Sequence, residues 1–134
     1  MRVRVLCTTL ESFEICKEYN IWAATNNLFK QWCVGDVLIF RVEGKIAGYA
    51  KMTGLPFKSD LIYWSNEVYP NRVPIGDWNL LNPQNWIEVN NEIKEFFLNS
   101  WGDHYGLKLI KQMPMGEADG DLLLKIINEK LKSQ

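Results

Sequence analysis

The stretch that decides the fold is GDVLIFRVEGKIAGYAKM, residues 35–52. Its first two residues predict a turn, and the apolar run at 37–40 is typical of a strand that is covered on both faces. The Glu-Gly pair at 43–44 predicts a tight connection to a partner strand over residues 45–52. Gly48 lies inside this second strand, where a glycine indicates a bend or a close approach of another backbone segment. The stretch therefore predicts a β-hairpin within a covered sheet.

The residues before the hairpin predict a strand followed by two helices. Val and Arg alternate over residues 2–8, as expected of a strand with one wet face. Residues 8–11 resemble a capping box, with Thr followed three positions later by Glu, and predict a helix that Asn20 ends. Trp22 then falls in a connector, and residues 25–32 predict a second short helix.

The residues after the hairpin predict irregular strands and further helices. Residues 68–75 contain two prolines, so we expect an edge strand or an irregular one. A short strand is predicted over residues 86–88, and a helix that an asparagine caps carries the apolar residues at 93–97. Residues 107–113 predict a late strand, and residues 117–131 predict a final helix. The order of elements indicates an α+β fold with a central, mostly antiparallel sheet that curls into a small barrel.

Composition and charge exclude several classes of protein. Hydrophobic residues make up 47% and charged residues 23% of the 134 residues, which is typical of one folded domain. The 15 Lys and Arg residues against 16 Asp and Glu residues disfavour a protein that holds nucleic acid by bulk charge.

The 3 cysteines form no CxxC pair and accompany 1 histidine, so we expect no metal and no cofactor. No apolar run is long enough for a membrane span, and we expect a cytoplasmic monomer.

The sequence contains no assembled catalytic set. His104 is the only histidine, and it follows Asp103 in a loop flanked by glycines, where a capping or surface role is more usual. The patterns of serine hydrolases, phosphate-binding loops, zinc proteases and EF-hands are also missing. We therefore predict that the chain is not an enzyme.

The aromatic content is the one unusual feature, with 6 Trp, 5 Tyr and 6 Phe. Trp22 and Trp64 fall in loop-like positions, where no periodicity requires a core residue. Two such rings can hold a flat nucleobase between them, because stacking contributes about 1–3 kcal/mol per base. The alternative is that each ring closes the rim of the barrel, and composition and spacing alone favour this alternative.

A resemblance to a known family favours the base-binding role of the two tryptophans over the packing role. The segments that carry it, in chain order, are YNIWAAT (19–25), VGDVLIF (34–40), KIAGYAKM (45–52), IYW (62–64), YPNRV (69–73) and GEAD (116–119). Together they resemble the EVE and YTH branch of the PUA-like superfamily. The resemblance implies one EVE/PUA-like domain over residues 1–134, a curved β-barrel of five to six mostly antiparallel strands flanked by helices. It also implies a module that binds a modified or flipped base of RNA or DNA in an aromatic pocket.

The resemblance also implies a set of ligand-binding residues. Those expected to contact the base are Trp22, Trp64, Thr8, Ser12, Asn20, Ala23, Tyr63 and Tyr69. The two tryptophans would stack on the base, and the small polar residues would test its hydrogen-bonding edge. The third aromatic wall is left open between Tyr63, Tyr69 and Val68. Lys51, Lys58 and Arg72 are expected to hold flanking phosphates, with a structural ion pair as the alternative for Arg72.

Two other functions fit the same sequence. One is an RNA-processing enzyme of the PUA-like ASCH type, whose turnover would be lost on replacing Asp103 or His104. The other is a protein-interaction domain with a vestigial pocket. This last alternative predicts that Trp22 and Trp64 pack in the core with little exposed ring surface.

Overall fold

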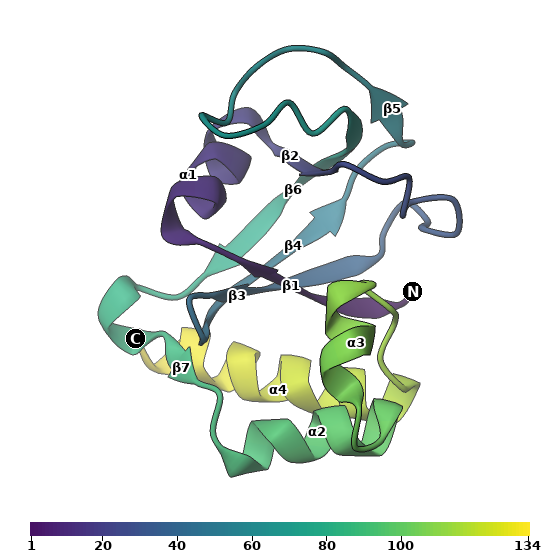
Figure 1. The fold of residues 1–134 in the computed structure, drawn as a ribbon. Coiled ribbons are helices and arrows are strands. Elements are labelled where there is room, and N and C mark those ends of the chain that lie inside the picture. Colours follow the sequence, from purple (N-terminus) through teal and green to yellow (C-terminus); the bar gives the residue numbers. More distant parts are fainter.

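The computed structural model describes all 134 residues, which form a seven-stranded sheet and four α-helices. In chain order the elements are β1 (Val3–Thr8), α1 (Leu10–Tyr19), β2 (Ile21–Ala24), β3 (Val37–Val42), β4 (Lys45–Met52), β5 (Phe57–Lys58), β6 (Asn71–Leu80), the 3-10 helix η1 (Pro83–Asn85), β7 (Ile87–Glu88), α2 (Asn91–Trp101), α3 (Tyr105–Ile110) and α4 (Glu117–Ser133). Figure 1 shows α1 on one side of the sheet, and α2, α3 and α4 gathered on the other.

The sheet is mixed but mostly antiparallel. Its strands follow the order β1-β3-β4-β6-β2, with β5 pairing β6 and β7 pairing β4. Only β1 and β3 run parallel, and every other pair is antiparallel. The predicted α+β class, with a curled and mostly antiparallel sheet flanked by helices, is confirmed. The predicted hairpin is also confirmed as β3 and β4, joined by a turn at Glu43 and Gly44.

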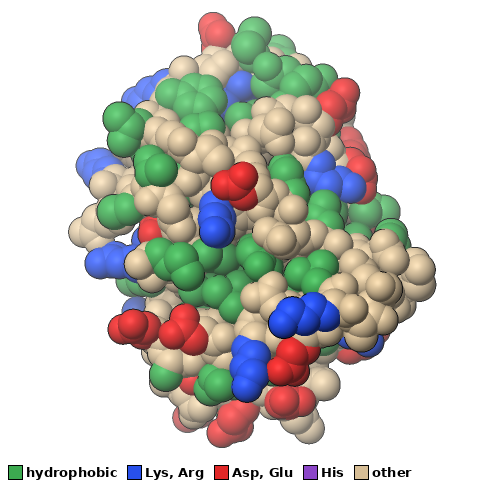
Figure 2. All heavy atoms as spheres, turned by 180° about the vertical axis from the view of Figure 1, so that it is seen from behind, with side chains coloured by type: hydrophobic (Ala, Val, Ile, Leu, Met, Phe, Trp, Pro, Cys, Tyr) green, Lys and Arg blue, Asp and Glu red, His purple; other side chains and the backbone are tan.

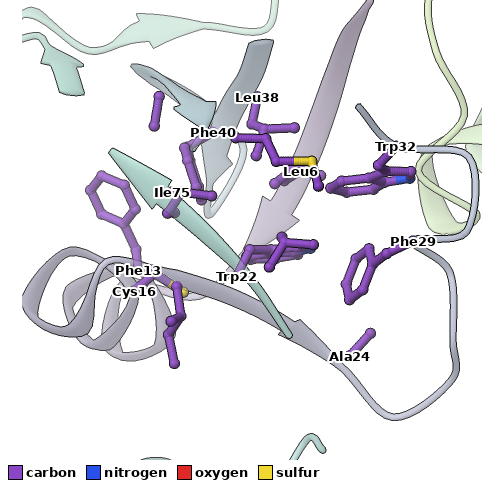
Figure 3. Packing of buried hydrophobic residues seen from close by; sticks show 14 of the residues in the cluster. Leu6, Phe13, Cys16, Trp22, Ala24, Phe29, Trp32, Leu38, Phe40 and Ile75 are labelled. Atoms are coloured by element: carbon purple, nitrogen blue, oxygen red, sulfur yellow. The ribbon is translucent and has the colours of Figure 1, made fainter. Parts of the chain in front are cut away.

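Two hydrophobic cores lie on opposite faces of this sheet. The first contains Trp22 and packs against α1, and the second packs against α2, α3 and α4. Along β3, Leu38 and Phe40 face the first core, whereas Val37 and Ile39 face the second. This alternation explains why the strand is apolar on both faces. Figure 3 shows the first core converging on Trp22 from α1 and from the segment between β2 and β3.

Gly48 allows β6 to cross closely over β4. Its φ is +141°, and a Cβ atom there would overlap the carbonyl oxygen of Asn79 and lie 2.9 Å from the Cα of Leu80. The close approach that the sequence predicted is therefore confirmed, and it is made by the backbone of β6.

Replacing Gly48 by alanine is expected to lower the free energy of unfolding by about 3 kcal/mol, because strained φ and backbone overlap both oppose a Cβ atom. Gly106→Ala is the matched control, since a Cβ atom at Gly106 meets nothing within 4 Å. Urea unfolding at equilibrium measures both variants. Equal stability of the two variants would contradict the role given to Gly48.

Two details of the strand predictions are corrected, and both depend on pairing between distant segments. Trp22 lies in β2 rather than in a connector, because β2 pairs with β6 and sets Trp22 opposite Val73. Of the two alternatives for the segment with two prolines, the edge strand is wrong, since β6 pairs first with β2 and then with β4. The irregular alternative fits, because β6 begins only at Asn71 and Tyr69 has a φ of +50°. Pro74 is tolerated there because the ladder uses its carbonyl oxygen, which accepts from the Thr53 N–H at 3.0 Å.

Two helix predictions and one further strand prediction also need correction. Thr9, not Thr8, caps α1 by accepting a hydrogen bond from the N–H of Ser12. Residues 25–32 form turns instead of a helix. Residues 107–113, predicted as a strand, belong to α3 and the turn after it, because their backbone bonds locally, as in the hydrogen bond from the N–H of Lys111 to the carbonyl oxygen of Leu107.

Candidate functional site

A pocket of about 660 Å³ lies between the start of α1, the end of β1, strand β2 and the loop that carries Trp64. Of the residues predicted to bind a base, those that line it are Thr8, Ser12, Trp22, Ala23, Trp64 and Tyr69. Its volume lies within the range of about 300–1,000 Å³ that is usual for small-molecule sites. The structure therefore brings these residues together around one hollow.

The two indole rings are held firmly at the edge of the pocket. The Trp22 Nε1–H donates to Oε1 of Gln112 at 2.9 Å, and the Trp64 Nε1–H donates to Oγ of Ser12 at 3.0 Å. Trp22 is 6% exposed and Trp64 is 5% exposed, and both belong to the first core. Such low exposure is what the interaction-domain alternative predicts. The rings nevertheless border the pocket, as a base-binding site requires.

Tyr69 supplies the third aromatic wall. Its ring lies 5.2 Å from that of Trp64 at an angle of 73°, and its hydroxyl accepts from Nδ2 of Asn66 at 2.9 Å. Tyr63 instead stacks on Tyr19, with ring centroids 3.9 Å apart, and does not line the pocket. The three candidates that the sequence left open are thus reduced to Tyr69, because Val68 does not line the pocket either.

Arg72 has a structural position, so its predicted contact with phosphate is wrong. The residue is 1% exposed, and its guanidinium donates to the backbone carbonyl oxygens of Leu61, Val68 and Tyr69. It also lies against the Trp64 ring, 5.5 Å from the centroid. A phosphate cannot reach a group that is buried and already bonded to three carbonyl groups. Arg72 instead holds the loop that places Trp64 and Tyr69 at the pocket.

Three other predicted contacts do not line the pocket. Asn20 ends α1 in a left-handed conformation, and its Oδ1 accepts from the indole N–H of Trp78. Lys51 lies between two residues that face the first core, so strand alternation directs its side chain to the opposite face. Lys58 is exposed on β5, outside the lining.

The pocket is nearly free of charge. Glu11 is the only charged side chain in its lining, and it accepts a hydrogen bond from the hydroxyl of Ser65 at 3.1 Å. No Lys or Arg side chain lines the pocket. Figure 2 likewise shows basic and acidic side chains interspersed over the face opposite to that of Figure 1, without a broad basic patch. The site therefore suits a neutral group better than a phosphate.

Gln112 and Ile110 also line the pocket, and neither role was predicted from the sequence. They lie at the end of α3 and just after it, in a segment that the alternation of apolar residues assigned to a strand. A local pattern carries no signal for them, because the tertiary fold alone brings this segment to the indole of Trp22.

The thiols of the pocket are not activated nucleophiles. Burial raises the pKa of Cys7, although Arg41 lies beside it, and burial raises the pKa of Cys16 to about 12. Both thiols are therefore protonated at neutral pH, whereas a nucleophilic cysteine needs a thiolate. His104 is exposed at the start of α3 and does not line the pocket.

No cluster of His, Cys, Asp and Glu suited to a metal ion is present, and no helix has the length and apolar character to cross a membrane.

A second hollow, of about 550 Å³, lies on the other flank of α1 and includes Phe13 and Trp86 in its lining. Its charged side chains are engaged within the protein. Lys17 pairs with Glu14 at 3.0 Å, and Lys45 pairs with Glu88 at 3.3 Å. The first pocket therefore combines aromatic walls with unengaged polar groups better than the second one does.

The fold is similar to that of solved YTH domains. No family model matches the sequence, and no curated protein matches it. The MmI1 YTH domain superposes with a TM-score of 0.68 at 19% identity, covering 100% of both chains. The YTH domain of the Zygosaccharomyces rouxii MRB1 protein, in complex with N6-methyladenosine RNA, superposes with a TM-score of 0.62 at 15% identity, covering 94% of this chain and 86% of that chain. The Toxoplasma CPSF4 YTH domain, in complex with a 7-mer m6A-modified RNA, superposes with a TM-score of 0.60 at 14% identity, covering 96% of this chain and 91% of that chain. These likenesses establish the YTH-like fold.

Proposed function

We propose that this chain is a nucleic-acid-binding module that recognises a modified or flipped base in the pocket between Trp22, Trp64 and Tyr69. The observation that carries the proposal is that three aromatic side chains and several neutral polar groups border one pocket. The likeness to YTH domains solved with methylated RNA supports it. We extend the proposal to RNA or single-stranded DNA as partner, to an EVE-like member of the superfamily, and to a cytoplasmic monomer.

The base would enter the pocket unpaired, because aromatic walls can reach its faces only outside a duplex. Thr8 and the backbone of Ala23 lie at the same pocket and would contact the edge of the base. Phosphate contacts would have to come from outside the lining, where Lys58 is exposed on β5. Because the pocket contributes no basic side chain, affinity for unmodified strands should be low.

Binding would require the pocket to open. Each indole exposes only 5–6% of its surface in the free protein, which is too little for a base to stack on a full ring face. Ile110, which also lines the pocket, is 74% exposed, so moving its side chain would cost little buried surface. The indole N–H bonds to Gln112 and Ser12 would keep the ring edges in place while the faces are uncovered.

A binding module fits the site better than an enzyme does. Both cysteines of the pocket are held in the protonated form, and the only histidine lies elsewhere. The pocket therefore lacks both an activated nucleophile and a histidine base, and we propose recognition without turnover.

A fluorescence titration tests the proposal directly. The wild-type protein is titrated with the four ribonucleosides, their base-methylated forms and short single strands of RNA and DNA that carry the same bases. We expect one modified base to quench tryptophan emission at concentrations where its unmodified parent does not. A folded protein that responds to no member of the panel would contradict the proposal and favour the interaction-domain alternative.

A further inference from the structure

We propose that Gln112 determines which edge of a base the pocket accepts, by presenting a fixed pair of N–H donors beside Trp22. This inference rests on the proposed function and adds to it the hydrogen-bonding class of the ligand. The ligand would be a nucleobase that offers an acceptor atom, either a carbonyl oxygen or an unprotonated ring nitrogen, next to the Trp22 ring.

The position of Gln112 is fixed by two contacts with different parts of the fold. Its backbone carbonyl oxygen accepts from Nη1 of Arg4 at 2.8 Å, and its side-chain Oε1 accepts from Nε1 of Trp22 at 2.9 Å. Its φ is +55°, in the left-handed region that few residues other than glycine adopt. An unusual conformation held at both the backbone and the side chain indicates that the side chain is placed with precision.

The backbone contact of Gln112 is itself rigid. Arg4 comes from β1, is 3% exposed, and lies over the Trp32 ring at 4.6 Å from the centroid. Its Nε also lies 3.9 Å from Oδ2 of Asp36. Gln112 is therefore fastened to the central sheet, although it belongs to a turn at the surface.

The contact with Trp22 decides which way the amide of Gln112 points. An indole N–H can only donate, so the group that faces it must be the amide oxygen. The amide nitrogen then points away from the indole, and it donates to no group of the protein. Gln112 is half-buried and lines the pocket, so these two N–H donors are available to a ligand.

The other polar groups of the pocket do not impose the same choice. The hydroxyl groups of Thr8 and Thr25 rotate and can either donate or accept. The amide of Asn66 is engaged with the hydroxyl of Tyr69. Glu11 can only accept, and it already accepts from Ser65. Gln112 is thus the amide of the lining whose free groups a donor-only partner restricts to N–H donors. A base that set an N–H donor against it would leave both groups unpaired and bind about 10–100-fold more weakly.

Gln112→Glu tests this inference, because the carboxylate can still accept from the Trp22 N–H but offers no donors. The probes are adenosine, inosine, cytidine, uridine and their base-methylated forms, each titrated against wild type and variant. We expect the nucleosides that bind best to the wild-type protein to bind about 10–100-fold more weakly to Gln112→Glu. Nucleosides with a donor edge should lose less than about 3-fold in affinity. Gln84→Glu, exposed on η1 and outside the pocket lining, is the matched control for the added charge.

A purely structural role would give a different result. If Gln112 only supported Trp22, Gln112→Met would lower the affinity for every nucleoside by one common factor. Gln112→Glu, which can still accept from the indole N–H, would then bind all of them as the wild-type protein does. Such a uniform change, or no change, would overturn the inference while leaving the proposed function standing. A wild-type protein that binds no nucleoside would instead overturn the proposed function, and this inference with it.

Discussion

The double replacement Trp22→Leu and Trp64→Leu is expected to lower affinity for the modified base about 100-fold or more. Stacking contributes about 1–3 kcal/mol for each ring, and two walls are lost together. Leucine is a better replacement than alanine here, because both indoles are at least 94% buried in the first core. Alanine would leave two large cavities, each costing about 3–5 kcal/mol, and together they would remove most of the stability of a small domain.

A matched control separates the loss of binding from the loss of stability. Trp101 is partly buried against the second core, donates to the carbonyl oxygen of Pro114 at 3.0 Å, and does not line the pocket. Trp101→Leu should therefore destabilise the fold without changing affinity. Calorimetric titration measures binding without relying on indole fluorescence, and circular dichroism verifies folding. Unchanged affinity in a folded double variant would contradict the proposed site.

The parts of the fold that the sequence predicted are those determined locally. The β3–β4 hairpin follows from its turn and from the apolar runs on both sides of it, and α1 ends where Asn20 adopts its left-handed conformation. Strand β2 could not be predicted in the same way. It has four residues and becomes a strand because β6, some fifty positions later, pairs with it.

The site shows the same division between local and distant information. The resemblance predicted Trp22 and Trp64 as pocket residues and left Tyr69 as one of three candidates for the third wall. All three line one pocket, and their contact with a base stays a prediction. The positions of Arg72 and Lys51 could not be predicted, because a charged residue in a strand gives no sign of the face it occupies. That face depends on register, and the β4–β6 pairing shifts register between Tyr49 and Lys51.

Replacing Arg72 by methionine is expected to lower the free energy of unfolding by about 3–5 kcal/mol and to remove base binding. Methionine approximates the volume of the side chain but removes the donor from three backbone carbonyl groups that Arg72 satisfies. The loop over residues 61–69 would then lose the contact that holds Trp64 and Tyr69 at the pocket. Arg2→Met is the control, because Arg2 is an exposed arginine of the same chain and does not line the pocket.

Arg72→Lys distinguishes this structural role from the phosphate contact that the sequence predicted. A lysine keeps the positive charge but lacks the planar guanidinium that lets arginine donate to three carbonyl groups at once. We therefore expect the free energy of unfolding of Arg72→Lys to fall by about 2–3 kcal/mol. Its affinity for a single-stranded ligand should fall by a similar factor at low and at high salt. If Arg72 held a phosphate, Arg72→Lys would keep most of its stability, and Arg72→Met would reduce the dependence of log affinity on log salt by about 0.7. Urea unfolding together with titrations at several salt concentrations decides between the two roles, because burial predicts a loss of stability without a change in salt dependence.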